Sequence, residues 1–329
     1  MRLLVTGGTG FFGKALLRFW GFQASGDGEG RQVTVLSRNP DQFQEEHREL
    51  TTVPWLRFVR GDIMEPATLS EASAALEGTT HVLHAATDST RGLKLSPLQR
   101  FDQILTGTRH ILDLTVRIGA RRFLLCSSGG VYGAPPTGVF QFEESYHGVP
   151  DPLLPNNAYS IGKRAAEHLC SLYAAQYGLE VVVARCFAFV GRDLPIDAHF
   201  AIGNFIRDAI YRSTITVAGD GTAVRSYLDQ RDLARWLTVM LERGSAGRAY
   251  NVGSDKAINM SDLARLVRDV LSPQKRIEIL GAASSNENRN FYVPSIERAR
   301  RELGLDVLIP LQRAIQDAAM TRVGTVHRD

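Results

Sequence analysis

The sequence begins MRLLVTGGTGFFGKALLRFW (residues 1–20), in which a short apolar run leads into a glycine-rich turn. Gly7, Gly10 and Gly13 recur at every third position, and the residues after them are typical of a helix. A strand, a glycine turn and a helix in this order predict a pyrophosphate site, because glycines allow close approach and the helix presents N–H groups to an anion. Taken alone, such a triplet is also compatible with an ordinary tight turn.

Beyond this turn, apolar β-branched runs alternate with amphipathic stretches. The pattern predicts strands at residues 3–6, 33–37, 56–60, 81–85, 122–126 and 181–185, a late strand at 250–253, and helices at 12–20, 97–118 and 158–177. This is typical of an α/β protein with a Rossmann-type, doubly wound parallel sheet. We assign the NAD(P)-binding domain to residues 1–184 and 228–253, and a smaller C-terminal α/β substrate-binding region to residues 185–227 and 254–329.

Composition limits the class of protein. The 329 residues include 44% hydrophobic residues, enough for a sizeable core, and the net charge is only +3. The arginines are spread along the chain, so we expect no nucleic-acid partner. We find no apolar stretch of membrane-spanning length and no secretory signal, and we therefore expect a cytosolic protein without a membrane partner. Cys126, Cys170 and Cys186 lack paired spacing, which favours buried free thiols and no metal site.

The end of the second expected strand bears on the cofactor. It reads VTVLSRNP (residues 33–40), and Ser37 and Arg38 occupy the position where NAD-binding folds carry an acidic residue. An arginine there can bind a 2′-phosphate through two parallel hydrogen bonds. We therefore favour NADP(H), with NAD(H) as the alternative. The competing interpretation of Arg38 is an exposed side chain in a turn before Asn39-Pro40.

A second motif, NNAYSIGKRAAEHL (residues 156–169), carries a tyrosine and a lysine four residues apart. On a helix, Tyr159 and Lys163 share one face, where an ammonium group can lower the pKa of a phenol toward neutrality. Such a phenol can exchange a proton with an alcohol or a ketone. Ser128, near the end of the fifth strand, would share the hydrogen bond to the reacting oxygen. The alternatives are a chance pair and a serine that merely ends a strand.

Several motifs occur together and in a fixed order. They are GGTGFFG (7–13), GDI (61–63), HAA (84–86), SSGGVYG (127–133), YSIGK (159–163), RSYLDQRD (225–232) and YNVGS (250–254). With these motifs, the chain resembles the extended short-chain dehydrogenase/reductase family, in its branch of NAD(P)-dependent sugar-nucleotide epimerases, dehydratases and reductases.

The resemblance implies roles for individual residues. Ser128, Tyr159 and Lys163 would form the catalytic triad, with Lys163 also on the nicotinamide ribose. The cofactor would contact Gly7, Gly10, Phe11, Phe12, Gly13, Ser37, Arg38, Asp62, Ile63, Ala85, Ala86, Tyr159 and Lys163, with Asp62 and Ile63 near the adenine. A nucleoside-diphosphate sugar would contact Ser128, Asn204, Val217 and Arg225, with Arg225 at its pyrophosphate.

The same resemblance implies a homodimer formed through helices 97–118 and 158–177.

Some of the candidate site residues and histidines also have a purely structural interpretation. Arg225 is also compatible with a solvated or paired arginine, and we interpret His84 and His199 as packing histidines.

Departures from the family pattern narrow the reaction. Gly129 and Gly130 replace the acid pair of the 4,6-dehydratases, and Gly130 also replaces a cysteine found in combined epimerase-reductases. Ala188 stands where such sequences often carry a substrate-facing asparagine. We therefore expect NADPH-dependent reduction of a 4-keto-6-deoxyhexose, with NAD-dependent 4-epimerisation as the alternative. A non-catalytic NADP-binding sensor is a third hypothesis, but it would be expected to lack Tyr159 or Lys163.

Overall fold

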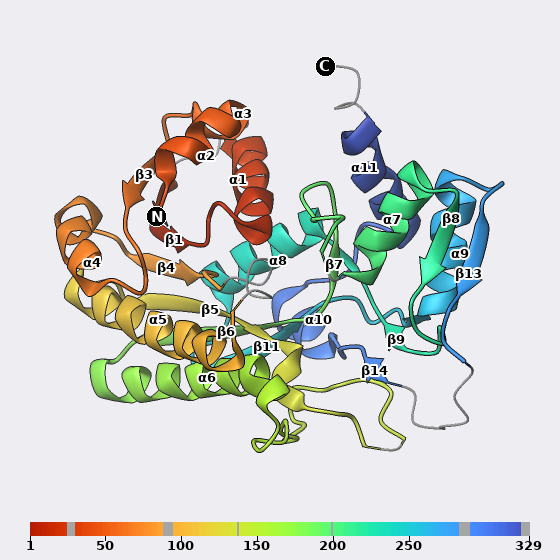
Figure 1. Cartoon of the computed structure of the whole chain (residues 1–329). Coiled ribbons are helices and arrows are strands. Elements are labelled where there is room, and N and C mark those ends of the chain that lie inside the picture. Colours follow the sequence, from red (N-terminus) through yellow and green to blue (C-terminus); the bar gives the residue numbers. More distant parts are fainter. Residues whose placement is uncertain (25–29, 88–94, 137, 199, 283–289, 324–329) are drawn as a thin grey trace. The chain divides into compact units, whose positions relative to one another are not determined.

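The structure, a computed structural model, describes residues 1–24, 30–87, 95–136, 138–198, 200–282 and 290–323 (Figure 1). The chain divides into two compact units. Unit 1 comprises Met1–Gly133, Val149–Cys186 and Ala234–Tyr250, and unit 2 comprises Ala134–Gly148, Phe187–Leu233 and Asn251–Asp329.

Unit 1 is built on a seven-stranded sheet with the order β11-β6-β5-β4-β1-β2-β3. Its strands are β1 (Arg2–Thr6), β2 (Gln32–Ser37), β3 (Leu56–Arg60), β4 (His81–His84), β5 (Arg122–Ser128), β6 (Glu180–Cys186) and β11 (Arg248–Val252). Strands β1 to β6 pair in parallel, and the order reverses direction next to β1. The predicted doubly wound α/β sheet is confirmed.

The helices of unit 1 follow the strands. They are α1 (Phe11–Ala24), α2 (Pro40–Glu46), α3 (Arg48–Thr51), α4 (Pro66–Ala72), α5 (Pro97–Arg117), α6 (Ala158–Tyr177) and α8 (Gln230–Arg243), with 3₁₀ turns η1 (Ser73–Leu76), η3 (Gly129–Tyr132) and η4 (Pro155–Asn157). Helix α5 begins at a capping box, in which Ser96 Oγ accepts from the Gln99 N–H and the Gln99 side chain accepts from the Ser96 N–H.

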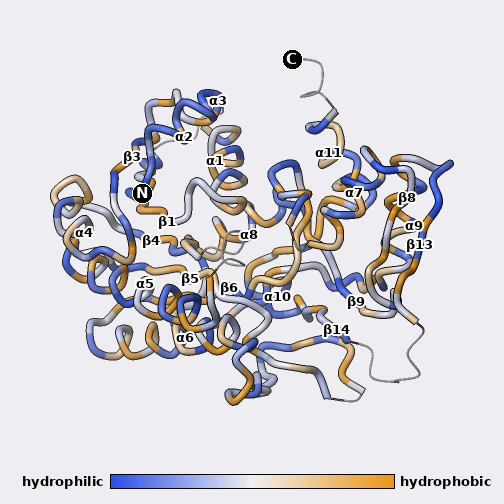
Figure 2. Tube along the Cα trace, in the orientation of Figure 1, coloured by the Kyte–Doolittle hydropathy of each residue, from blue (hydrophilic) through white to orange (hydrophobic). Residues whose placement is uncertain are grey.

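Helices cover both faces of the sheet, which explains why its strands are continuous apolar runs. On one face, Leu4 and Phe123 belong to a buried cluster with Ile111 of α5 and Ala166 of α6. Along α5 and α6, which lie side by side, Figure 2 shows hydrophobic residues alternating with hydrophilic ones. Elsewhere in the unit, the Trp20 indole of α1 donates to Thr238 of α8 at 2.9 Å.

The described residues of unit 2 form small sheets and four helices. Its strands are β7 (Phe189–Val190), β8 (Thr214–Val217), β9 (Val224–Arg225), β10 (Leu228–Asp229), β12 (Ile258–Asn259), β13 (Arg276–Ile279) and β14 (Phe291–Tyr292). Its helices are α7 (Ala201–Tyr211), α9 (Met260–Leu271), α10 (Glu297–Leu303) and α11 (Leu311–Val323). The strands of unit 2 form the two-stranded sheets β10-β7 and β13-β8 and a three-stranded sheet with the order β12-β9-β14.

Several observed boundaries differ from the expected ones by one or more residues. Strand β5 continues to Ser128, whereas β4 ends at His84, one residue early. Helix α1 continues to Ala24, four residues beyond its expected end at residue 20. Residues 25–29 and His199 lie outside the described ranges. The late strand joins the main sheet as β11, next to β6. None of the helices within the described ranges is long and apolar enough to cross a membrane.

Candidate active site

The glycines of the turn after β1 have two roles. Some allow close backbone packing within the protein, and one leaves room for a ligand. Gly7 has a φ of +75°, which strains any side chain, and a Cβ there would lie 2.7 Å from the Ala85 carbonyl. At Gly13 a Cβ would lie 2.1 Å from the Gly8 carbonyl. At Gly10 it would meet only the Gly7 oxygen, at 3.4 Å. The protein itself therefore leaves room beside Gly10, and this fits close approach by a dinucleotide before the amino end of α1.

The end of β2 is followed by an arginine whose side chain has no partner among the residues that the structure describes. Ser37 ends β2, and the Arg38 side chain is exposed and makes no hydrogen bond or ion pair with any described residue. The neighbouring Arg60 is already used, because it donates to the Arg38 carbonyl at 3.0 Å and to the Asp41 carboxylate at 2.6 Å. The Arg38 guanidinium thus remains available to an anion.

The loop after β3 holds the two residues expected near the adenine. The Asp62 carboxylate accepts from the Met64 N–H at 2.9 Å, a local turn contact. The Ile63 carbonyl lies 2.8 Å from His110 Nδ1, and the Ile63 side chain packs against Gly107 of α5. Both residues lie at the carboxyl end of the sheet, in a loop fixed by α5.

His84 is a fully partnered packing residue, as the sequence analysis proposed. Its Nδ1 lies 2.7 Å from Thr6 Oγ1, and its Nε2 lies 3.2 Å from Thr108 Oγ1. Thr108 donates to the Ile104 carbonyl, so Nε2 carries the proton that reaches Thr108, and Thr6 donates to Nδ1. Thr6 Oγ1 also accepts from the Ala86 N–H at 3.3 Å. Burial, with the nearby Lys163 charge, lowers the pKa of His84 to about 3.

The structure brings Ser128, Tyr159 and Lys163 together. Ser128 ends β5, and its hydroxyl accepts from the Gly130 N–H at 3.1 Å and hydrogen-bonds the Tyr159 phenol. A hydroxyl that accepts an N–H in this way can still donate its own proton to an oxygen. Lys163 Nζ lies 6.0 Å from the Tyr159 ring centroid.

The Lys163 ammonium is held by two groups that sequence reasoning missed. It donates to Thr87 Oγ1 at 2.7 Å and to the Cys126 carbonyl at 2.8 Å, and its side chain is buried. An ammonium has three protons, so one remains for a ligand. Thr87 follows Ala86 in the loop after β4, a position that could have suggested it. A backbone carbonyl leaves no such signal.

One expectation about the phenol is wrong. Burial raises the pKa of Tyr159 to about 12, and the Ser128 hydrogen bond opposes that shift only in part. The Lys163 ammonium, which was expected to lower this pKa, donates to Thr87 and the Cys126 carbonyl instead. Burial also lowers the pKa of Lys163. At neutral pH, Tyr159 is therefore a protonated group that can donate.

In unit 2, Arg225 has the character of an anion-binding residue. Its Nη1 donates to the carbonyls of Val224 and Asn290 at 2.8 and 2.7 Å, and its guanidinium lies 5.7 Å from the Tyr292 ring centroid. Burial lowers its pKa, and no carboxylate among the described residues pairs with it. A partly buried cation without a counter-ion favours an anionic ligand.

The other two expected substrate residues of unit 2 differ from Arg225. Asn204 lies on α7, and its side-chain oxygen accepts from Arg207 at 3.1 Å. Val217 lies on β8, where its side chain is 2% exposed and its carbonyl accepts from the Leu280 N–H. Its role as a substrate residue stays a prediction.

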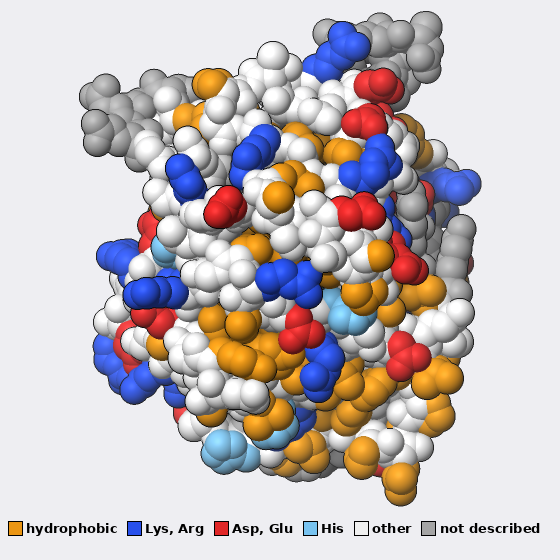
Figure 3. Space-filling view, turned by 90° about the vertical axis from the view of Figure 1, so that its left-hand side faces the viewer, with side chains coloured by type: hydrophobic (Ala, Val, Ile, Leu, Met, Phe, Trp, Pro, Cys, Tyr) orange, Lys and Arg blue, Asp and Glu red, His pale blue; other side chains and the backbone are white. Residues whose placement is uncertain are grey.

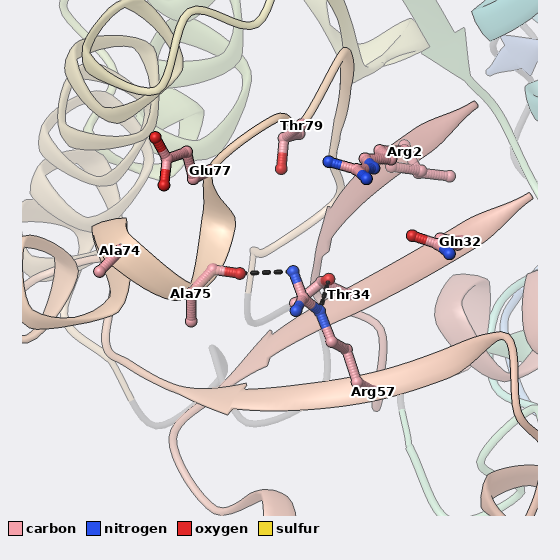
Figure 4. A pocket seen from close by; sticks show the side chains of 9 residues that line it. Arg2, Gln32, Thr34, Arg57, Ala74, Ala75, Glu77 and Thr79 are labelled. Atoms are coloured by element: carbon pink, nitrogen blue, oxygen red, sulfur yellow. Dashed lines mark hydrogen bonds between the residues drawn. The ribbon is translucent and has the colours of Figure 1, made fainter.

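A separate cavity of about 310 Å³ lies at the amino edge of the sheet (Figure 4). Arg2 and Gln32, the first residues of β1 and β2, line it together with Arg57, which donates to Thr34 Oγ1 at 2.7 Å. The glycine turn, Ser128 and Lys163 lie at or near the carboxyl edge instead. The cavity in Figure 4 is therefore not the candidate active site.

A doubly wound sheet with a glycine turn after β1, and with serine, tyrosine and lysine grouped after β5, defines a nicotinamide-dependent oxidoreductase of the short-chain type. The model of the NAD dependent epimerase/dehydratase family matches residues 3–253. The chain belongs to this family, which confirms the resemblance found in the motifs.

Known proteins resemble the chain over nearly its whole length. UDP-glucuronic acid decarboxylase 1 of Arabidopsis thaliana is 29% identical over 316 residues, 96% of this chain and 68% of that protein. The UDP-glucose 4-epimerase structure from Thermotoga maritima has a TM-score of 0.83 at 21% identity and covers 99% of this chain and 100% of its own. The dTDP-glucose 4,6-dehydratase structure from Streptomyces venezuelae has a TM-score of 0.80 at 26% identity, with coverages of 100% and 98%.

Proposed function

We propose that this protein transfers hydride between a nicotinamide cofactor and a sugar carbon of a nucleoside-diphosphate sugar, and that it reduces a 4-keto-6-deoxyhexose with NADPH. The observation that carries the proposal is the grouping of Ser128, Tyr159 and Lys163 next to two glycines. Gly129 and Gly130 have no group that can exchange a proton, so no second acid or base accompanies the triad for the removal of water.

The residues present fit the cofactor. The glycine turn would hold the pyrophosphate at the amino end of α1, Arg38 the 2′-phosphate, and the third Lys163 proton a ribose hydroxyl. When bound, the reduced cofactor supplies the hydride. Asp62, Ile63, Ala85 and Ala86 would line the adenine and the dinucleotide from the loops after β3 and β4.

The state of Tyr159 suits reduction. With a pKa of about 12, its phenol is protonated at neutral pH and can give a proton to the C4 oxygen as hydride reaches C4. Ser128 would hydrogen-bond that oxygen before transfer and the phenolate after it. The C4 carbonyl is thereby reduced to an alcohol, with one hydride and one proton added. At the other end of the substrate, Arg225 and Asn204 would bind the diphosphate and its nucleoside.

Two other reactions can use the same triad. An epimerase oxidises C4 and returns the hydride to the other face, and the fold likeness to an epimerase is compatible with this. Oxidation at C4 of a nucleotide-linked uronic acid moves a hydride to the cofactor and makes a β-keto acid that loses CO₂, after which the same hydride returns to the C4 carbonyl. The 29% identical decarboxylase favours this reaction as a candidate. Neither consumes reduced cofactor overall, whereas reduction consumes one NADPH per sugar. Cofactor stoichiometry is therefore the experiment that tests the proposed function.

Cofactor choice is predicted to depend on Arg38. Replacing Arg38 with Asp removes a cation from the 2′-phosphate, and we expect NADPH binding to weaken by about 10-fold to 100-fold, the scale of one charge-assisted hydrogen bond. NADH binding should be unchanged or improved. Fluorescence titration with both cofactors measures this, and Arg48→Asp, the same charge change at an exposed residue of α3, is the control. Tighter binding of NADH by the wild type, with no response to Arg38→Asp, would reject the assignment.

We also propose a homodimer formed through α5 and α6. Three large hydrophobic side chains on these helices are about half exposed or more: Leu98 of α5, and Leu172 and Tyr177 of α6. Figure 3 shows hydrophobic side chains gathered in the lower half of the face it presents. Exposed apolar groups on two adjacent helices favour burial against a second copy.

A further inference from the structure

An ion pair lies next to the triad and does not belong to it. Glu167 is on α6, four residues after Lys163, and Arg185 is on β6. Arg185 Nη2 lies 2.7 Å from Glu167 Oε2, and its Nε lies 3.1 and 3.2 Å from the two carboxylate oxygens. The two side chains are only 13% and 15% exposed. This is the forked, charge-assisted geometry that fixes both direction and distance.

The pair also holds the chain on both sides of Ser128. Ser127 donates to Glu167 Oε1 at 2.5 Å, and Arg185 Nη1 donates to the Tyr132 hydroxyl at 3.1 Å. The Arg185 guanidinium also lies 4.9 Å from the Tyr132 ring centroid. Ser127 immediately precedes Ser128, and Tyr132 ends η3, the turn that Ser128 caps.

We propose that the Glu167–Arg185 pair is the positioning element of the active site, which holds the end of β5 and the η3 turn against α6 so that Ser128 meets Tyr159. The inference rests on the proposed function in assigning a catalytic use to that contact. Glu167 and Arg185 are positioning residues, because neither is in contact with Ser128, Tyr159 or Lys163 in the hydrogen bonds described above.

Two physical arguments support this role. A buried ion pair contributes little net stability, because desolvation offsets its attraction. Stability alone therefore does not explain a pair that also binds Ser127 and Tyr132. In addition, Tyr159, Lys163 and Glu167 recur at intervals of four and share one face of α6. A contact at Glu167 therefore fixes the position of α6 along β5, and with it the position from which Lys163 Nζ donates to the Cys126 carbonyl. The carboxylate also opposes the lowering of the Lys163 pKa by burial.

The test is Glu167→Gln, which keeps the shape of the side chain and removes its charge. We expect kcat to fall by about 10-fold to 100-fold, as misplacement near 1 Å does, with KM within twofold. We also expect Lys163 to titrate at a lower pH than in the wild type. ¹³C NMR of lysine Cε reports this, since the chain has five lysines and Lys163→Ala assigns the signal. The control is Glu180→Gln, which breaks the 2.9 Å pair with Arg122 at the other end of β6 and should change neither quantity.

Ser127→Ala is the second variant, and it decides the question if Glu167→Gln does not fold. It removes one contact to Glu167 and leaves the ion pair, so kcat should fall several-fold with an unchanged unfolding midpoint. Wild-type kcat in Ser127→Ala, or an unchanged Lys163 titration and kcat in a folded Glu167→Gln, would overturn the proposal. Absence of wild-type turnover with every nucleotide sugar would instead reject the proposed function, while the NMR titration of Glu167→Gln would still test the electrostatic link to Lys163.

Discussion

Tyr159→Phe is expected to lower kcat by at least about 100-fold, the usual contribution of a general acid, while NADPH still binds. The phenylalanine keeps the ring in place between α6 and β5 but has no proton to give to the C4 oxygen. Cofactor binding should survive because Lys163, the glycine turn and Arg38 are untouched. Steady-state kinetics and fluorescence titration of NADPH measure the two effects separately.

Two comparisons make this result specific. Lys163→Ala should impair both turnover and cofactor binding, since that ammonium would contact the ribose as well as support the site. Tyr211→Phe, at an exposed tyrosine at the end of α7, should leave both unchanged. Turnover near the wild-type value in Tyr159→Phe would remove Tyr159 from the acid/base role.

The second large effect concerns stability and pH. His84 is neutral in the folded protein because burial lowers its pKa to about 3, while an unfolded histidine titrates near 6.5. The unfolded chain therefore binds the extra proton between these values, and the folded state loses stability as pH falls from about 6.5 to 3. The difference of about 3.5 pKa units corresponds to an upper value of roughly 5 kcal/mol in the free energy of unfolding.

Denaturant unfolding of the wild type and His84→Gln from pH 7 to pH 4 measures this contribution. Glutamine has no charge to gain, so the advantage of the wild type should shrink as the pH is lowered. His168→Gln, at an exposed histidine of α6, should instead follow the wild-type curve. A gap between wild type and His84→Gln that stays constant from pH 7 to pH 4 would contradict a neutral, buried His84.

Local spacing made part of the site predictable from sequence. The glycines every third residue indicated the turn after β1, and the interval of four indicated that Tyr159 and Lys163 share a helical face. Ser128 followed from the end of a strand, even though β5 proved two residues longer than expected. These features depend on residues close together in the chain, where the periods of strands and helices apply.

The parts of the site that could not be predicted from the sequence depend on which strands become neighbours in the sheet. Thr87, Glu167 and Arg185 come from three different elements, and their contacts exist only because β4, β5 and β6 are adjacent. The raised pKa of Tyr159 arises from burial that no spacing reveals. The burial of the Val217 side chain within unit 2 is likewise not evident from its position in a strand.

The ratio of NADPH consumed to sugar reduced tests the proposed reduction most directly. Purified protein mixed with NADPH and a 4-keto-6-deoxy nucleotide sugar is predicted to consume one NADPH for each sugar reduced, followed by absorbance and by chromatography of the product. Without added cofactor, it should not interconvert gluco- and galacto-configured nucleotide sugars. Interconversion without added cofactor, together with no loss of NADPH absorbance, would contradict reduction and establish the epimerase alternative.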